Sequence, residues 1–275
     1  MNSEHAAFGV NTYSYTFGGS AADTVARLAD QGYGGVELMF FPGHLWPAEL
    51  DASALRRLRD LCEARLRLIA VNMPNVDINV AAAAGEMRAY TMELLTKFVR
   101  CAGELGAGGI IIGPGKPNPL FPMPRERMIT HFYRALDVLA PLARQSGTKL
   151  FIENMPFAFL PDAESLMRAV DGYGDDGIRV IYDVANAHFI AESPIEGLRR
   201  VRERLSLVHF SDTTRQSYKH DPLGWGDVPL AGLASGMKEV GYKGLPMLEV
   251  ISHNPDADIA DSCRRLREAG FGDAG

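Results

Sequence analysis

A short apolar run, Leu150-Phe151-Ile152, ends in the acid and amide pair Glu153-Asn154. Three later runs have the same form, since each ends in an acid or a histidine: Val180-Ile181-Tyr182-Asp183, Leu207-Val208-His209 and Met247-Leu248-Glu249. Runs that stay apolar at successive positions are typical of parallel strands, because protein covers both faces of a parallel sheet. We therefore expect parallel strands whose last residues are polar.

Segments with strand-like and helix-like patterns alternate over the whole chain. Strands are predicted at 8–12, 35–39, 68–72, 109–112, 149–153, 179–183, 206–210 and 245–250. Apolar residues at helical spacing predict helices at 21–31, 54–65, 87–105, 128–146, 162–170, 195–205, 230–240 and 258–269. Because 275 residues is close to the roughly 250 of an eightfold barrel, we predict a single (β/α)8 TIM barrel domain over residues 1–275.

Glycines and prolines mark the connections. Glycines stand at or just past five predicted helix ends, at positions 32, 106, 147, 241 and 270. Five prolines between Pro114 and Pro124 predict a long ordered loop after the fourth strand, which either covers the barrel mouth or is purely structural.

Composition excludes several classes of protein. The net charge of −6 argues against nucleic acid as a main partner, because such binding depends on basic residues. No apolar run approaches the roughly 20 residues of a membrane span, and Met1–His5 lacks the pattern of a secretory signal, so we expect a cytoplasmic protein. The dinucleotide and P-loop glycine motifs are missing from the sequence. Cys62, Cys101 and Cys263 are expected to be packing residues.

The four polar strand ends predict a metal site. In a (β/α)8 barrel the carboxyl ends of the strands meet at one mouth, where Glu153, Asp183, His209 and Glu249 would converge. A divalent cation would turn the mutual repulsion of the three carboxylates into coordination. Three oxygen ligands and one nitrogen suit Mn²⁺, Mg²⁺ or Co²⁺. We expect one ion, with Mn²⁺ first and Zn²⁺ a further possibility.

At these motifs the chain resembles the xylose isomerase-like TIM-barrel superfamily. The most specific pieces are Glu153-Asn154, Asp183 with His188, His209-Phe-Ser-Asp212, the loop Gly224-Trp-Gly226-Asp-Val, and Glu249. The superfamily includes sugar isomerases and epimerases, inosose and dehydroshikimate dehydratases, and an endonuclease branch. The resemblance implies that Glu153, Asp183, His209 and Glu249 bind one catalytic metal ion, and that Glu153 and Glu249 exchange protons with the substrate.

We therefore expect a divalent-metal-dependent isomerase or epimerase acting on a sugar, a sugar phosphate or a cyclitol. A metal that holds a carbonyl and its neighbouring hydroxyl stabilises the enediolate formed when a C–H proton is removed, and a carboxylate is an adequate base for that step. Similarity to ketose epimerases implies that His188 and Arg215 contact substrate oxygens. Asn154, beside Glu153 in the matching motif, is expected to bind substrate as well.

Three further residues are candidates at the barrel mouth. Similarity to the endonuclease branch places His220 where that branch has another metal ligand, and we expect it at the substrate site. Glu37 is either a substrate contact or an ion-pair partner. Trp46 could form a wall of the site or pack on a neighbouring subunit.

The chain departs from two branches of the superfamily. The endonucleases hold three metal ions with extra histidines, but Glu37, Gly113 and Asn186 stand at those positions, which argues against a trinuclear phosphodiesterase site. The ketose 3-epimerases have a second glutamate six residues after the strand-five ligand, and Phe159 stands there, so their free-ketose specificity is not expected to carry over.

Two alternatives stay open. A lyase of the inosose or dehydroshikimate dehydratase type would use the same enediolate, with His188, His220 or Lys219 as the acid at the leaving oxygen. A non-catalytic sugar-binding barrel would be expected to have lost a metal ligand. A homo-oligomer, dimer or tetramer, is the expected assembly.

Overall fold

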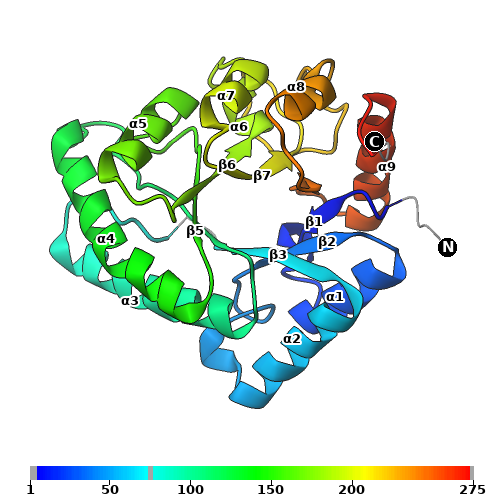
Figure 1. Cartoon of the computed structure of the whole chain (residues 1–275), viewed down its shortest axis with the longest axis horizontal. Helices are drawn as coiled ribbons and strands as arrows, with labels where there is room; N and C mark the ends of the chain where they lie inside the picture. The colour runs from blue at the N-terminus through cyan, green and yellow to red at the C-terminus, as the bar shows by residue number, and fades with distance from the viewer. Residues whose placement is uncertain (1–4, 74–76, 273–275) are drawn as a thin grey trace.

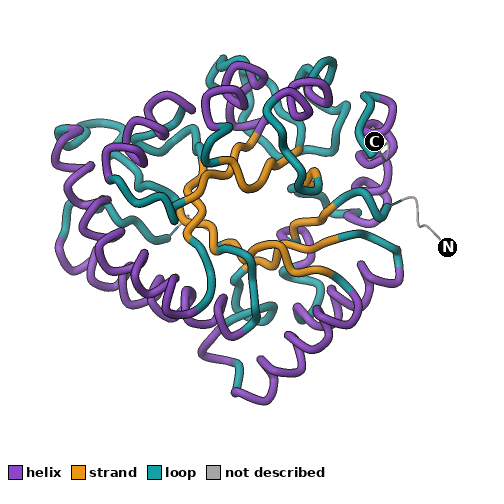
Figure 2. Tube along the Cα trace, in the orientation of Figure 1, coloured by secondary structure: helices purple, strands orange, loops and turns teal. Residues whose placement is uncertain are grey.

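The computed structural model describes residues 5–73 and 77–272. Apart from His5, the Met1–His5 segment considered for a targeting signal lies outside the described residues. The described residues form eight parallel strands that close into a barrel in chain order, β1 to β8, and Figure 2 shows the ring they make inside a layer of helices. The strands are β1 (Gly9–Asn11), β2 (Gly35–Met39), β3 (Arg67–Asn72), β4 (Ile110–Ile112), β5 (Leu150–Glu153), β6 (Arg179–Asp183), β7 (Leu205–Phe210) and β8 (Pro246–Leu248). The predicted (β/α)8 TIM barrel is confirmed.

Helices lie outside the barrel, and Figure 1 shows them following the strands in order around it. They are α1 (Ala21–Asp30), α2 (Ala52–Arg65), α3 (Gly85–Glu104), α4 (Arg125–Ser146), α5 (Ala163–Tyr173), α6 (Val184–Phe189), α7 (Pro194–Val201), α8 (Leu233–Glu239) and α9 (Pro255–Glu268). Eight of them correspond to predicted helices, with shifted ends. Helix α6 was not predicted, because its six residues are too few to show a helical period.

Two apolar layers stabilise the barrel. The larger one lies between strands and helices and includes Phe8, Phe40, Phe132 and Tyr182. The smaller one fills the barrel interior with Ala70, Ile111, Phe151, Ile181, Leu207 and Met247. Side chains two positions apart on a strand point to the same side. The polar residues that end β5, β6 and neighbouring strands therefore lie directly above this inner apolar layer.

The local signals in the sequence have the expected structural basis. The five glycines predicted at helix ends, at positions 32, 106, 147, 241 and 270, all have φ between 72° and 91°, which favours glycine. The three cysteines are free and buried, as predicted for packing residues. Among the described residues, no helix is both long and apolar enough to cross a bilayer.

We predict that Gly109→Ala destabilises the barrel. A Cβ at this position would lie 2.4 Å from carbons of the Phe151 ring, which fills the barrel interior. The expected loss is about 1–3 kcal/mol of unfolding free energy, measured by denaturant titration. Gly85→Ala is the matched control, because its added Cβ would come no closer than 3.7 Å to Arg88. Equal stabilities of the two variants would contradict the prediction.

Candidate metal centre and substrate cavity

Four polar side chains meet at the carboxyl end of the barrel. Glu153 ends β5, Asp183 ends β6, His209 lies in β7 and Glu249 directly follows β8. Asp183 and His209 are neighbours in the register of β6 and β7. One potential ligand atom from each of the four residues lies within 4.8 Å of those of the other three, and all four residues are buried. The residues predicted from the strand ends are therefore brought together by the closed barrel.

The imidazole of His209 is the centre of this group. Its Nδ1 lies 3.1 Å from Glu249 Oε2, 3.7 Å from Glu153 Oε1 and 3.8 Å from Asp183 Oδ2. Its Nε2 lies 2.8 Å from Glu37 Oε2. A carboxylate can only accept, so Nε2 donates to Glu37 and Nδ1 is directed at the other three carboxylates. This is the arrangement of a metal-binding histidine held by a carboxylate behind it.

Glu37 therefore supports the site from behind. It is fully buried, and its Oε1 accepts hydrogen bonds from the side-chain amides of Asn11 (2.6 Å) and Asn72 (2.8 Å). Of the two roles considered for Glu37, the ion-pair partner agrees with this geometry and the substrate contact does not, since the Glu37 carboxylate is enclosed by protein.

Asp183 is oriented by hydrogen bonds to its two neighbouring segments. Its Oδ1 accepts from the backbone N–H of Asn186 at the start of α6 (2.7 Å). The Asn154 side chain accepts from the Asp183 N–H and donates to its carbonyl oxygen, at 2.7 and 3.1 Å. Asn154 is fully buried by this contact and does not line the cavity, so its predicted role as a substrate ligand is corrected to that of a positioning residue.

The donor set fits a divalent cation. Asp183 Oδ2 is buried, and within the described chain it has no hydrogen-bond partner. Burial raises the pKa of Glu153 to about 7 and that of Asp183 to about 6. Burial would also raise the pKa of Glu249, but the charges of His209 and His220 lower it to about 2. Burial thus opposes ionisation of all three carboxylates together. A bound cation would offset the repulsion between their negative charges.

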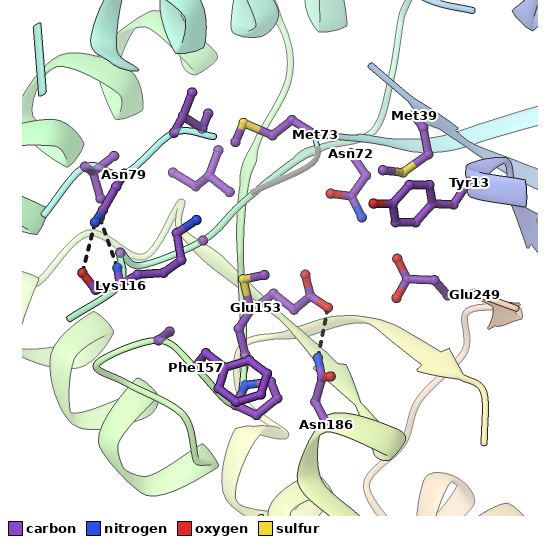
Figure 3. Close-up of a pocket in the computed structure, with 18 of the residues that line it drawn as sticks. Tyr13, Met39, Asn72, Met73, Asn79, Lys116, Glu153, Phe157, Asn186 and Glu249 are labelled. Atoms are coloured by element: carbon purple, nitrogen blue, oxygen red, sulfur yellow. Dashed lines mark hydrogen bonds between the residues drawn. The ribbon is translucent and has the colours of Figure 1, made fainter. Parts of the chain in front are cut away.

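A cavity of about 380 Å³ opens beside this group. Figure 3 shows the carboxylates of Glu153 and Glu249 facing the same space, with Tyr13 and Asn186 next to them. Glu153, Glu249 and His220 were predicted from the sequence. Tyr13, Asn186 and Tyr218 also line the cavity but had not been assigned to the substrate site, because each lies in a loop or short helix after a strand and has no motif of its own.

A chain of polar contacts joins these residues, with hydrogen bonds as far as His220 and an ion-pair contact from His220 to Glu249. Asn186 Nδ2 lies 3.4 Å from Glu153 Oε1, and Asn186 Oδ1 accepts from the Tyr218 hydroxyl at 2.8 Å. Tyr218 also contacts His220 Nε2 at 2.9 Å, and His220 Nδ1 lies 3.4 Å from Glu249 Oε2. Burial raises the pKa of Tyr218, which keeps its hydroxyl protonated at neutral pH. The chain connects the two glutamates around one side of the cavity.

The remaining candidates lie away from the cavity lining. His188 is buried and its Nε2 contacts Asp227 at 2.7 Å, whereas Arg215 is exposed. Their contacts with substrate stay predictions. Trp46 packs edge-on against Phe98 of α3, with ring centroids 5.2 Å apart, and is not among the residues that line this cavity, so its place in the wall of the site stays a prediction.

The proline-rich loop contributes only its first part to the site. Gly113, Gly115 and Lys116 line the cavity, but the side chains of Leu120 and Phe121 are 92% and 88% exposed. In this structure the tip of the loop does not cover the site.

A model of the family described as xylose isomerase-like TIM barrel matches residues 25–269. The chain belongs to the xylose isomerase-like TIM-barrel family. An uncharacterized protein of Methanocaldococcus jannaschii is 23% identical over 238 residues, covering 84% of this chain and 79% of that protein. Fructoselysine 3-epimerase of Shigella flexneri is 20% identical over 230 residues, covering 82% and 83%. The crystal structure of a D-tagatose 3-epimerase-like protein has a TM-score of 0.81 at 22% identity, covering 95% and 96%.

We predict that the apparent affinity for Mn²⁺ rises with pH. Burial alone would lower the pKa of His209, but Glu37 and Glu249 raise it, and the pKa of Glu153 is raised as well. Both groups must release protons before they can act as ligands, so acid competes with the metal. Titration calorimetry at about pH 6 and about pH 8 should show tighter binding at the higher pH, by up to tenfold per pH unit for each proton released. An affinity independent of pH would contradict this.

We predict that Glu37→Gln weakens Mn²⁺ binding about 10- to 100-fold while the fold is retained, because Gln keeps the shape but loses the charge that holds His209. Calorimetry measures the affinity, and circular dichroism checks the fold. Glu49→Gln is the control, since Glu49 is exposed and bonds only to the backbone N–H of Gly43 among the contacts described. Equal losses in the two variants would show that Glu37 does not act through His209.

Proposed function

We propose that this protein is a divalent-metal-dependent isomerase or epimerase of a keto-sugar or cyclitol. The observation that carries the proposal is the placement of Glu153 and Glu249. Both belong to the metal-binding group, and both face the cavity. The names of the similar proteins, fructoselysine 3-epimerase and D-tagatose 3-epimerase-like protein, support sugar chemistry.

The two glutamates would move the protons. One carboxylate accepts the proton of the C–H bond beside the substrate carbonyl, which leaves an enediolate. The other returns a proton, to the opposite face of the same carbon in an epimerisation or to the neighbouring carbon in an isomerisation. Carboxylates on two sides of one cavity suit this division.

The other polar residues at this end would hold the substrate. Tyr13 is a hydroxyl donor, and burial raises its pKa, so it stays protonated. Tyr218 donates its one hydroxyl proton to Asn186 and therefore holds Asn186 and His220 in place. Asn186 and His220 are fixed by their bonds to Tyr218 and can reach substrate oxygens from the same side. Together they orient the sugar so that its acidic C–H bond faces a carboxylate.

Glu153, Asp183, His209 and Glu249 would hold the cation, with Mn²⁺ as our first choice. When bound, the ion supplies positive charge that polarises the carbonyl and stabilises the enediolate. Assembly into a homo-oligomer and a cytoplasmic location stay predictions of the sequence.

A lyase is the second candidate, and the position of His220 favours keeping it. A lyase needs an acid at the leaving oxygen, and His220 lines the cavity. The other two candidate acids are less well placed, since His188 contacts Asp227 and the exposed Lys219 pairs with Asp221 at 3.3 Å. If elimination occurs, we expect His220 to protonate the leaving group.

We predict that Glu249→Gln abolishes turnover and keeps the fold, since it removes one negative ligand and one base without changing volume. The assay is incorporation of deuterium from heavy water into keto-sugars and inososes, followed by mass spectrometry with Mn²⁺ present. We expect a loss of at least about 100-fold, the lower range for a general base. Cys101→Ala is the control and should leave the rate unchanged, because Cys101 is buried in α3 away from the cavity. Exchange at the normal rate in Glu249→Gln would refute the site assignment.

A further inference from the structure

The substrate cavity has two chemically different ends. Figure 3 shows Glu249, Tyr13 and the Glu153 carboxylate on one side, and Lys116 and Asn79 on the other. Much of the described lining is apolar, and it includes Met73, Val80, Leu95, Ile112, Met155 and Phe157. Figure 3 shows Met73 and Phe157 nearer to Lys116 than Tyr13 and Glu249 are. The cavity is continuous, so a ligand that is bound at the glutamates and extends beyond the polar end meets this apolar end.

The loop after β5 contributes strongly to the apolar end. Met155, Pro156, Phe157 and Ala158 follow the Glu153-Asn154 pair directly and line the cavity. The next residue, Phe159, is buried against Phe132, with ring centroids 6.2 Å apart, and offers no polar group. The side chains of 155–159 therefore present no charged group or hydroxyl to the ligand.

A free ketose fits only the polar end. It carries an oxygen on every carbon, and a hydroxyl placed against an apolar wall loses its hydrogen bonds to water without replacement. The cavity volume of about 380 Å³ lies within the roughly 300–1,000 Å³ of pockets that bury drug-sized ligands. A ligand that fills the whole cavity needs a polar part and an apolar part.

We propose that the substrate is a keto-sugar that carries an aromatic substituent, with the sugar at the glutamates and the ring in the apolar end. The inference rests on the proposed function and narrows its substrate class. An aromatic group agrees with two features of the wall. The ring of Phe157 is 58% exposed and packs edge-on against Tyr218, so it is available for ring contact. The ammonium of Lys116 reaches into the same end, and ammonium groups bind the faces of aromatic rings.

Hydrogen bonds hold the wall of this end in place. The Asn79 side chain accepts from the backbone N–H of Lys116 at 3.0 Å and donates to its carbonyl oxygen at 2.9 Å. Asn79 Oδ1 also accepts from the N–H of Ala81 at 3.0 Å. These bonds join the segment after β3 to the loop after β4, so the apolar end is formed before a ligand arrives.

The test compares two ligands that differ only in the substituent. Methyl and phenyl β-D-glucopyranoside, and the corresponding galactosides, bind to the Mn²⁺-loaded protein in a calorimeter. Because burial of a phenyl ring is favourable, the phenyl compound of at least one pair should bind about 10- to 100-fold tighter. Phe157→Ala and Met155→Asn should each reduce this ratio of phenyl to methyl affinity about fivefold or more. Both side chains are at least partly exposed, so both variants are expected to fold.

Val138→Asn is the matched control, because Val138 is 52% exposed on α4 and is not a lining residue. The proposal is overturned if phenyl and methyl compounds bind equally in both pairs, if no phenyl glycoside binds up to its solubility limit, or if the control lowers the ratio as much as the cavity variants. A phenyl preference supports the substituent site whether or not a keto-sugar exchanges deuterium. Absence of deuterium exchange would contradict the proposed function alone. Deuterium exchange without a phenyl preference would leave the function standing and reject the substituent.

Discussion

The hydrogen bond between His209 Nε2 and the buried carboxylate of Glu37 is the contact on which the site depends. It directs Nδ1 toward three carboxylates that approach from β5, β6 and the residue after β8. Glu37 is held in turn by two asparagine side chains from β1 and β3. Five strands and the residue after β8 thus support one imidazole, which is possible only because the barrel closes.

The same closure explains the unequal ends of the cavity. The four residues of the candidate metal site must be polar, and the apolar layer inside the barrel lies beneath them. The loops beyond the strands are free of that requirement. After β5 the chain changes within two residues from a ligand, Glu153, to the apolar wall that begins at Met155. The end of β5 thus contributes to the candidate metal site, and the connection that follows it contributes to the shape of the ligand pocket.

Sequence reasoning succeeded where the signal was local or periodic. Strand runs, the glycines after helices and the four polar strand ends could all be found, because each depends on a residue type at a defined place in an element. It failed where a side chain's role depends on its neighbours in space. For Trp46 the residue type suggested a wall of the site or a subunit contact, and it did not reveal the contact with Phe98 of α3. Tyr218 was overlooked, although its hydroxyl joins Asn186 to His220.

The amino-acid sequence by itself determined the barrel and the four candidate metal ligands at its mouth, because hydrophobic periodicity and the polar ends of buried strands are properties of short segments. Only the tertiary structure decided that Glu37 and Asn154 are enclosed by protein behind the candidate ligands, and that much of the cavity lining is apolar. These features arise from contacts between separate segments, such as Glu37 with Asn11 and Asn72, and Asn154 with Asp183. Contacts between residues that are distant in the chain cannot be read from the pattern of a short segment.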